Sequence, residues 1–495
     1  MSPKILYWTG FVIYGIVVIA VGLKAYLKKK RNSDGGSSFW TADRNLSATS
    51  VGLSISAGMM SISWSCVYGV QLFYWYGVSA SWLLAIPWLL ALAGFALLVP
   101  WLRRFQAFSQ PEMIGARFGV RARQLLAMPL AFVYLIWCGA EIYAAAQVVA
   151  PMLECSFHLA LLLIAAIVAI YSFLGGFDAV VATDKIQFAL VAFFVITMVW
   201  LGLRALPDAP LTALTQITTP PKAAGDALSL TAAGIPLILI TLVAYLPGWL
   251  VTTDVWLRLQ AARSIAAARR GAFIAILNSF VFIAAAPMII GLSALYLFPP
   301  ENGAIPAMLH DGTAIFAVFM KEFSSTSLNI FLTIGLAAAA MSTIDTTGNV
   351  MALSIYYDLI EPARQHQLSA KAKILLPRLI SAFAIALAFI YAIFTDSLWD
   401  IFYLSSGILT TTIFIPMAAT VLPSARPLQV HAAIIAGFVS TLLFYFLESR
   451  GMLANVEPAW LSRTGIGYIL WGLLTATLAF GVAGRKTVMV RKAEP

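Results

Sequence analysis

Four acidic side chains lie within long apolar segments of the sequence. They are Glu141, Asp184, Asp254 and Asp345. A charged side chain at the centre of a bilayer costs about 2.5–3.5 kcal/mol on insertion scales, so an acid in such a place is a candidate for function. The nearest basic residues are few, namely Lys185 and Arg258. We therefore expect most of these acids to lack an internal salt bridge and to be visited by a proton or a metal cation.

The apolar segment 328–356 carries oxygen-bearing groups along one face of a helix. Positions i, i+3, i+4 and i+7 of this face are Ala339, Ser342, Thr343 and Thr346. Asp345 and Asn349 flank the same stripe. Because hard cations prefer carboxylate, hydroxyl and carbonyl oxygen, the pattern indicates a cation site. The alternative is that the hydroxyls only bond to carbonyls one turn earlier, which is common in membrane helices.

Two further apolar segments are interrupted near their centres. Segment 47–70 has glycines and serines throughout positions 52–63, and segment 233–255 contains Pro247 and Gly248. The two segments are five spans apart, and paired interruptions at matching places are typical of a transporter site built on inverted repeats. Backbone carbonyls freed at membrane depth are tolerated where they line a cavity or bind an ion. The alternative is that the small residues only allow helices to pack closely.

We expect the solute site beside these two interruptions. The candidate solute-binding residues are Ser61, Trp64, Glu141, Tyr143, Trp249, Asp254 and the stretch from Tyr403 to Ser406. Aromatic side chains in membrane helices also serve as interfacial or packing residues, which is the alternative for each of them.

The composition places most of the chain in lipid. Hydrophobic residues make up 61% of the 495 residues and charged residues only 11%, against roughly 25% charge in soluble proteins. Apolar runs of about 20 residues predict thirteen membrane spans. They are 5–27, 47–70, 78–102, 124–151, 158–174, 180–203, 233–255, 272–297, 328–356, 375–395, 399–423, 430–447 and 465–484.

The basic residues predict the orientation of these spans. With the N-terminus outside and the C-terminus inside, all but six of the 31 Lys and Arg fall toward the inside, which follows the positive-inside rule. The net charge of +10 therefore reports topology and not a nucleic-acid partner. The first span runs directly into the basic cluster 28–31, so we interpret it as a retained helix and not as a cleaved signal peptide.

Four sequence motifs resemble those of the sodium:solute symporter family. Residues 339–346 resemble the eighth core helix of that family, and residues 175–187 match its G-G…T-D-x-x-Q pattern. The loop 111–119 and the stretch 52–57 match as well. Thirteen spans with the N-terminus outside are also the layout of the family, so the resemblance covers nearly the whole chain.

The resemblance implies an all-α polytopic membrane protein with a LeuT-like fold in a single transporter domain, 1–495. In this layout 5–27 is an extra N-terminal helix and 47–203 is the first five-helix repeat. The second, inverted repeat is 233–423, and two C-terminal helices fill 430–484.

The resemblance also implies ion sites. Backbone carbonyls of Ala57, Met60 and Ala339 and the hydroxyls of Ser342 and Thr343 would hold a sodium ion. Asp184 would form a second ion site or a release relay. The residues expected to share it are Ser342, Asp345 and Thr346. Some family members have serine where Asp345 stands.

The predicted function is sodium-coupled symport of a small organic solute into the cell by alternating access. One sodium ion driven by about 100 mV and a tenfold gradient supplies roughly 3.7 kcal/mol, enough for a few-hundred-fold accumulation of a neutral solute. The alternatives are a proton-coupled symporter on the same fold and a transporter-like membrane sensor. An enzyme is disfavoured because the sequence has no H-E-x-x-H, no G-x-S-x-G and no paired histidines. We expect a multi-pass protein of the cell membrane, such as a bacterial inner membrane, in which a monomer suffices.

Overall fold

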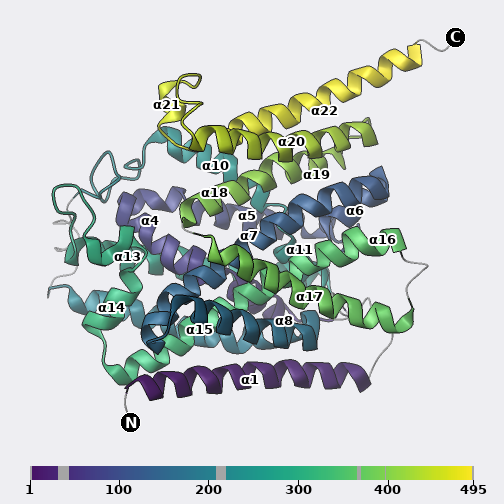
Figure 1. The fold of residues 1–495 in the computed structure, drawn as a ribbon. Coiled ribbons are helices and arrows are strands. Elements are labelled where there is room, and N and C mark those ends of the chain that lie inside the picture. The colour runs from purple at the N-terminus through teal and green to yellow at the C-terminus, as the bar shows by residue number, and fades with distance from the viewer. Residues whose placement is uncertain (1–2, 32–43, 208–218, 365–368, 396, 493–495) are drawn as a thin grey trace.

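The computed structural model shows an all-helical chain. It describes residues 3–31, 44–207, 219–364, 369–395 and 397–492. Within these ranges the only β-structure is two isolated bridges, and most helices run roughly side by side in one bundle (Figure 1). The expected all-α fold is confirmed.

Eleven helical runs in the described part of the chain are long and apolar enough to cross a bilayer. A bent pair, Ala48–Met59 with Ile62–Trp82, makes a twelfth, and the shorter apolar helix Tyr468–Gly484 lies where the thirteenth span is expected. Every expected span therefore falls on helix, and the chain is a multi-pass membrane protein. The number of thirteen crossings stays a prediction.

The first half of the chain contributes helices up to residue 205. They are α1 (Pro3–Arg31), α3 (Ala48–Met59), the π-helix η2 (Ile62–Tyr68), α4 (Gly69–Tyr76), η3 (Gly77–Trp82), α5 (Ala85–Leu102), α6 (Gln110–Phe118), α7 (Val120–Leu153) and α8 (Phe157–Ala205). A straight helix with the 49 residues of α8 would be about 74 Å long, more than twice the thickness of a bilayer core, so α8 is not one straight crossing. It holds two of the apolar spans, Phe157–Leu174 and Val180–Ala205.

The second half repeats the pattern of long and interrupted helices. Its elements up to residue 323 are α10 (Ile235–Trp249), α11 (Thr253–Gln260), α12 (Ile265–Ser279), η4 (Phe280–Ala285), α13 (Ala286–Leu297), η5 (Ala307–Gly312) and α14 (Ile315–Phe323). The remaining elements are α15 (Thr326–Leu353), η6 (Ser354–Ile360), α16 (Glu361–Arg364), α17 (Ala370–Ile393), α18 (Leu398–Ile408), η7 (Leu409–Phe414), α19 (Ile415–Ala419), α20 (Pro427–Ser449), α21 (Ala459–Ser462) and α22 (Tyr468–Lys492).

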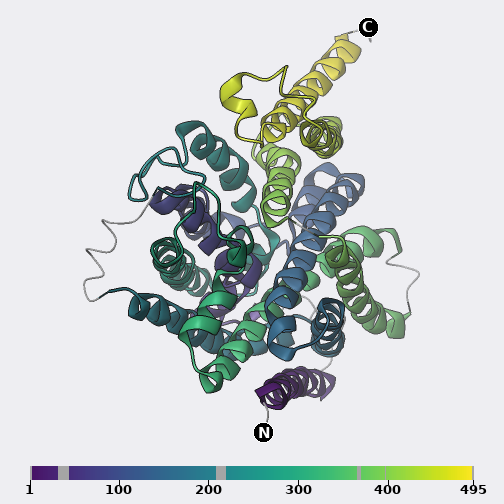
Figure 2. The same ribbon diagram turned by 60° about the vertical axis from the view of Figure 1, so that its left-hand side comes forward.

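The bundle has a buried centre and an apolar outer surface. The spans that contain α7, α15 and α18 are the most buried, and α15 packs against both α7 and α8. Helix α1 lies at one edge and α20 with α22 at the opposite edge (Figure 2). Large apolar side chains such as Leu97 and Phe331 point outward and are 73% and 61% exposed. Such a surface suits lipid, and the polar residues of the central helices are left to face one another.

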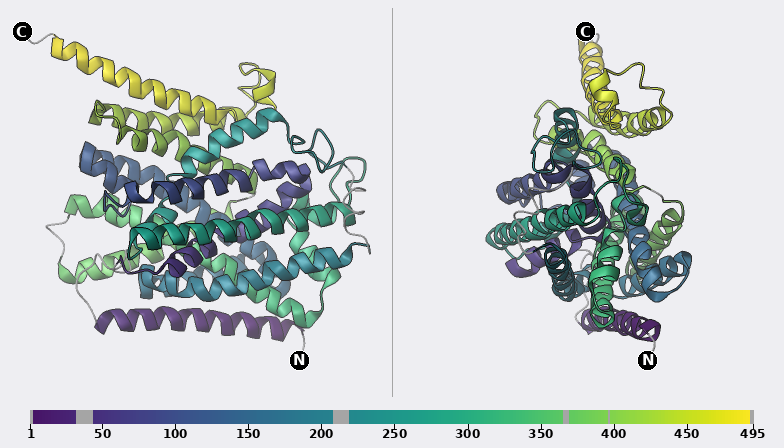
Figure 3. Two further views of the ribbon diagram at one scale, coloured as in Figure 1. Left: turned by 180° about the vertical axis from the view of Figure 1, so that it is seen from behind. Right: turned by 90° about the vertical axis from the view of Figure 1, so that its left-hand side faces the viewer.

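The two ends of the chain lie at opposite ends of the bundle. Helix α1 begins at the end where α14 lies, whereas α22 finishes at the end near α6 and α16 (Figures 1 and 3). An odd number of crossings produces this arrangement. Which end faces the cytoplasm stays a prediction from the basic residues.

Cysteine labelling tests this orientation. We expect a cysteine at Asn455, in the exposed turn before α21, to react with a membrane-impermeant maleimide in intact cells. A cysteine at Ala266, in the exposed first turn of α12, should react only after the membrane is opened. The background should carry Cys155→Ser, because Cys155 is partly exposed whereas Cys66 and Cys138 are buried. The reverse labelling pattern would invert every inside and outside assignment.

Candidate ion and solute site

The first interrupted span is broken at Met60 and Ser61. Met60 leaves the helical region with ψ 56°, and the two halves of the span meet at an angle of 63°. The second half then starts afresh, because the Ser61 hydroxyl accepts a hydrogen bond from Trp64 N at 2.8 Å and so caps it. The expected interruption of segment 47–70 is confirmed.

Glu141 of α7 is bonded directly to this break. Its buried carboxylate accepts hydrogen bonds from Ile62 N at 2.7 Å, from Ser63 N at 3.0 Å and from the Ser61 hydroxyl at 2.7 Å. The two amides, of Ile62 and Ser63, are donors that the interruption leaves without helical partners. Glu141 therefore stabilises the start of the second half of the helix, a role that its position in the sequence did not reveal.

Thr343 of α15 faces the other side of the break. Its hydroxyl lies 3.2 Å from the carbonyl oxygen of Gly58 and 3.4 Å from that of Ala339. Glycine at 58 also lets the next turn of α15 come close, since a Cβ there would lie 3.2 Å from the Thr346 hydroxyl. The unwound end of α3 and the polar face of α15 thus meet in a buried place. The remaining expected sodium ligands, Ala57 and Met60, lie in the same buried segment.

This set of groups fits a sodium ion by its chemistry. It offers carbonyl and hydroxyl oxygens from two helices, and it has no sulfur or imidazole ligand. Within the described residues no group of three or more His, Cys, Asp or Glu suggests a transition-metal site. The two expected hydroxyl ligands have different partners, however. The Ser342 hydroxyl donates to Asp184 Oδ1 at 2.8 Å, whereas the Thr343 hydroxyl reaches the break.

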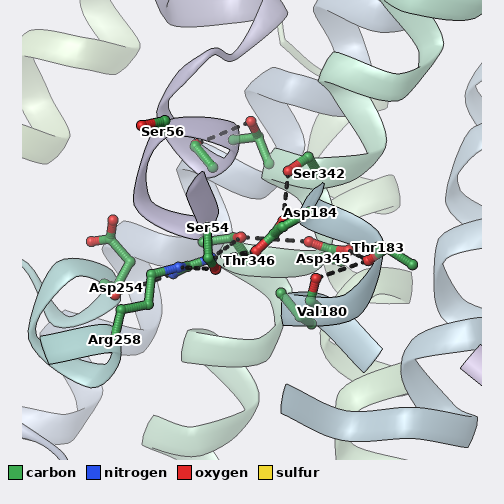
Figure 4. A network of polar contacts seen from close by, with 12 residues as sticks. Ser54, Ser56, Val180, Thr183, Asp184, Asp254, Arg258, Ser342, Asp345 and Thr346 are labelled. Carbon is green, nitrogen blue, oxygen red and sulfur yellow. Dashed lines mark hydrogen bonds and ion pairs between the residues drawn. The ribbon is translucent and has the colours of Figure 1, made fainter. Parts of the chain in front are cut away.

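Asp184 is neutralised by an internal salt bridge, contrary to the expectation from the sequence. Arg258 Nη2 lies 3.4 Å from Asp184 Oδ2, and both side chains are buried. The same carboxylate oxygen also accepts a hydrogen bond from the Ser54 hydroxyl (Figure 4). The sequence places Arg258 just past a span, but α11 continues inward from the second interruption and brings its last turn to the centre of the bundle.

Asp345 joins the same polar network from α15. Tyr171 donates to its Oδ2 at 2.8 Å, and the Thr183 hydroxyl lies 3.5 Å from the same atom. Thr346 connects Asp345 to Arg258, because its hydroxyl lies 3.5 Å from Asp345 Oδ1 and accepts from Arg258 Nη2 at 2.8 Å (Figure 4). Asp184, Asp345 and Thr346 of the expected second ion site are therefore neighbours, with a guanidinium among them.

Tyr134 of α7 forms hydrogen bonds at the break of the second interrupted span. Helix α10 ends at Trp249 and α11 begins at Thr253. The Tyr134 hydroxyl accepts from Thr253 N at 2.9 Å and donates to Asp254 Oδ1 at 2.8 Å. Helix α7 therefore contacts both breaks, through Glu141 at one and Tyr134 at the other.

A small cavity of about 50 Å³ lies between the two breaks. Its walls come from the α3 break, α5, α7, the α10–α11 break, α15 and α18. The residues that line it are Gly58, Met59, Ser61, Ser63, Trp64, Trp88, Tyr134, Trp137, Trp249, Thr252, Asp254, Thr343, Thr347, Phe402 and Ser406. Thr343 thus borders both the cavity and the carbonyls of the break.

Five of the expected solute-binding residues meet in this cavity, and the others do not line it. Ser61, Trp64, Trp249, Asp254 and Ser406, which lies within the expected stretch from Tyr403, line it. Glu141 is bonded to the break as described.

Tyr143 and Tyr403 lie elsewhere. Tyr143 lines a separate vestibule of about 970 Å³ at the end of the bundle where α14 lies, and it accepts from Gln147 Nε2 at 2.9 Å. Tyr403 stacks on Tyr245 with ring centroids 4.9 Å apart and bonds to the Thr241 hydroxyl.

Two tryptophans of the cavity were missed by the analysis of the sequence. Trp88 and Trp137 lie near the middle of their spans, whereas tryptophan in membrane helices is enriched at the interfaces. That central position was a usable signal. Trp88 packs edge to face on both Trp64 and Trp249, with centroids 5.5 and 5.7 Å apart. The cavity wall is thus a cluster of indole rings beside one carboxylate.

Comparisons with known proteins agree with this architecture. The model of the sodium:solute symporter family matches residues 39–422. A structure of a Na⁺-coupled sialic acid symporter superposes with a TM-score of 0.73, at 18% identity, and the match covers 96% of this chain and 98% of that one. A transporter of the nucleobase-cation-symport-1 family superposes with a TM-score of 0.51 at 12% identity, over 90% of this chain and 94% of that one. The expected LeuT-like fold is confirmed.

Curated relatives match over shorter stretches. Solute carrier family 5 member 4A of Mus musculus is 28% identical over 188 residues, which is 36% of this chain and 27% of the relative. Sodium/glucose cotransporter 1 of Sus scrofa is 28% identical over 197 residues, which is 38% of this chain and 28% of the relative. The matched part of the chain thus spans little more than a quarter of the length of these relatives.

Proposed function

The chain belongs to the sodium:solute symporter family, and we propose that it couples the entry of sodium to the uptake of a small organic solute. Transport proceeds by alternating access in the cell membrane, and a single copy of the chain contains the whole site. The observation that carries the proposal is the contact of the Thr343 hydroxyl with the Gly58 carbonyl at 3.2 Å. It joins the unwound end of α3 to the polar face of α15 and borders the cavity.

The sodium ion binds between these two helices. Carbonyl oxygens of Ala57, Met60 and Ala339 and the hydroxyls of Ser342 and Thr343 are its proposed ligands. The Ser342 hydroxyl donates its hydrogen to Asp184 Oδ1, which leaves the lone pairs of its oxygen for the ion. Because α3 and α15 belong to different repeats, an ion that needs ligands from both favours the conformation in which they are close.

The solute binds in the cavity beside the ion. The proposed contacts are Ser61, Trp64, Trp249 and Asp254, with indole faces for apolar or cationic parts and hydroxyls for polar ones. Glu141 holds the break in place and orients Ser61 toward the cavity. When the cavity closes around the solute, water is excluded from both the sodium ion and the solute.

A thermal-shift screen of the purified protein tests this function. Amino acids, sugars, organic acids and amines are screened in sodium and in potassium at one pH. We expect sodium alone to raise the unfolding temperature, and one solute class to raise it further only when sodium is present, since a ligand of the native state stabilises it by mass action. Stabilisation that is equal in sodium and potassium but varies with pH would replace this proposal with proton coupling.

A further inference from the structure

The hydroxyl groups that line the cavity between the two breaks direct their hydrogens into the protein. Those that donate to a carboxylate or to a backbone carbonyl belong to Ser61, Ser63, Tyr134, Thr252, Thr343 and Thr347. The remaining hydroxyl of the described lining, Ser406, accepts from Trp249 Nε1 at 3.1 Å. A hydroxyl that has donated its hydrogen can still accept through its oxygen. The cavity therefore presents mainly hydrogen-bond acceptors to a solute.

The indole N–H groups of the cavity wall are also largely occupied. Trp88, Trp137 and Trp249 donate to serine hydroxyls at 3.2, 2.6 and 3.1 Å. An indole has no other polar hydrogen, so these three side chains turn only their rings to the cavity. The face of an indole ring attracts a cation, because it carries the negative part of the ring quadrupole. The tryptophans therefore favour a positively charged group over one that needs a hydrogen-bond donor.

Asp254 brings a negative charge to the same wall. It is 2% exposed, and none of the described residues that line the cavity is Lys, Arg or His. In the part of the chain that the structure describes, its carboxylate takes part in no salt bridge. Arg258 donates to its backbone carbonyl, and the carboxylate points away from that guanidinium, which pairs with Asp184 (Figure 4). A buried carboxylate is costly unless a positive charge lies beside it, so this one favours a cationic ligand.

We propose that the solute is a protonated amine, whose ammonium group lies between the Asp254 carboxylate and the indole rings. The inference rests on the proposed sodium symport and names the chemical class of its solute. The charge of the ammonium group compensates Asp254, and its N–H groups find acceptors in the oxygens of Ser61 and Ser63. An anionic solute would meet a carboxylate and no basic side chain in this lining. A carbohydrate would bring many acceptor oxygens to a wall that has few free donors.

The thermal stability of the purified full-length chain tests the inference without any variant. Propyl-, isobutyl- and tert-butylammonium are compared in sodium with the alcohols and carboxylates of the same alkyl groups. The pH is held at about 7, where an alkyl amine is charged as lysine is, and the ionic strength is kept constant. We expect at least one ammonium ion to raise the unfolding temperature clearly more than its alcohol and its carboxylate do. An equal or larger rise with the alcohol or the carboxylate, or no rise with any ammonium ion, would overturn the inference. Sodium that fails to stabilise the chain would instead overturn the proposed function, so the two failures are distinguishable.

Asp254→Asn makes the test site-specific. Asparagine keeps the volume and can still accept from Tyr134, but it removes the charge. We expect the apparent affinity for the ammonium ion to fall by about tenfold or more, the effect of losing a hydrogen bond to a charged group, while sodium alone still stabilises the chain.

Asp311→Asn is the matched control for this variant. Asp311 lines the outer vestibule with a side chain that is 57% exposed, so its replacement should leave the affinity unchanged. If Asp254 only stabilises the first turn of α11, Asp254→Asn lowers the unfolding temperature but keeps the affinity for the ammonium ion, which would overturn the inference. If Asp254→Asn does not fold, the comparison of ammonium ion, alcohol and carboxylate on the parent chain decides.

Discussion

Thr343→Val is expected to weaken the apparent sodium affinity by about five- to hundred-fold, whereas Thr343→Ser is expected to change it little. Valine keeps the shape of threonine but removes the hydroxyl that lies 3.2 Å from Gly58 O. A buried ion that loses one ligand where water is excluded loses about 1–3 kcal/mol of binding free energy, which corresponds to this range of affinities. The sodium dependence of thermal stability measures the effect and needs no knowledge of the solute.

Thr333→Val is the matched control for this substitution. Thr333 is also a buried threonine of α15, and its hydroxyl donates only to the Asn329 carbonyl one turn earlier. It lies ten residues from Thr343, about 15 Å along the helix, so its replacement should leave the sodium affinity unchanged. If Thr343 serves only for packing, the order of the two variants at 343 is reversed, because valine fills the threonine volume and serine leaves a gap. A tolerated valine and a damaging serine would refute the sodium site.

Asp184→Asn is expected to destabilise the protein by about 3–5 kcal/mol, the usual cost of breaking a buried ion pair by removing one partner. Asparagine keeps the volume and one carbonyl oxygen, so the loss comes from the charge that Arg258 then lacks. Asp184→Asn combined with Arg258→Gln should cost clearly less than the sum of the single changes, since no uncompensated charge remains. Unfolding in mixed detergent micelles measures the free energies of all three variants.

Glu154→Gln provides the control for this prediction. Glu154 pairs with Lys4 at 3.5 Å, but both side chains are about half exposed or more. Exposed pairs contribute only about 0–1 kcal/mol, so this variant should remain close to the parent. Equal and small effects of Asp184→Asn and Glu154→Gln would mean that the Asp184–Arg258 pair is not a desolvated ion pair. Strictly additive effects in the double variant would mean that the two residues act independently.

The sequence alone determined the features that depend on local composition and on the helical repeat. Each of the expected spans lies on helix because a span of about 20 apolar residues must satisfy its own backbone in lipid. The interruptions near Met60 and near Gly248 followed from small residues and proline in an otherwise apolar run. The polar stripe with Ser342 and Thr343 followed from spacing along one helix. All of these are properties of neighbours in the sequence.

Only the tertiary structure decided how the polar residues pair across helices. Arg258 and Asp184 are 74 residues apart, and Glu141 meets Ile62 from 79 residues away. The side of a helix that faces a given neighbour depends on the rotation of the helix about its axis and on the crossing angle. Helix α7 is apolar on nearly every side, so it has no amphipathic pattern that fixes this rotation. For this reason the sequence identified the buried acids individually, but it could not show that Asp184 has an arginine as its partner, that Glu141 closes a helix break, or that Tyr403 packs away from the cavity.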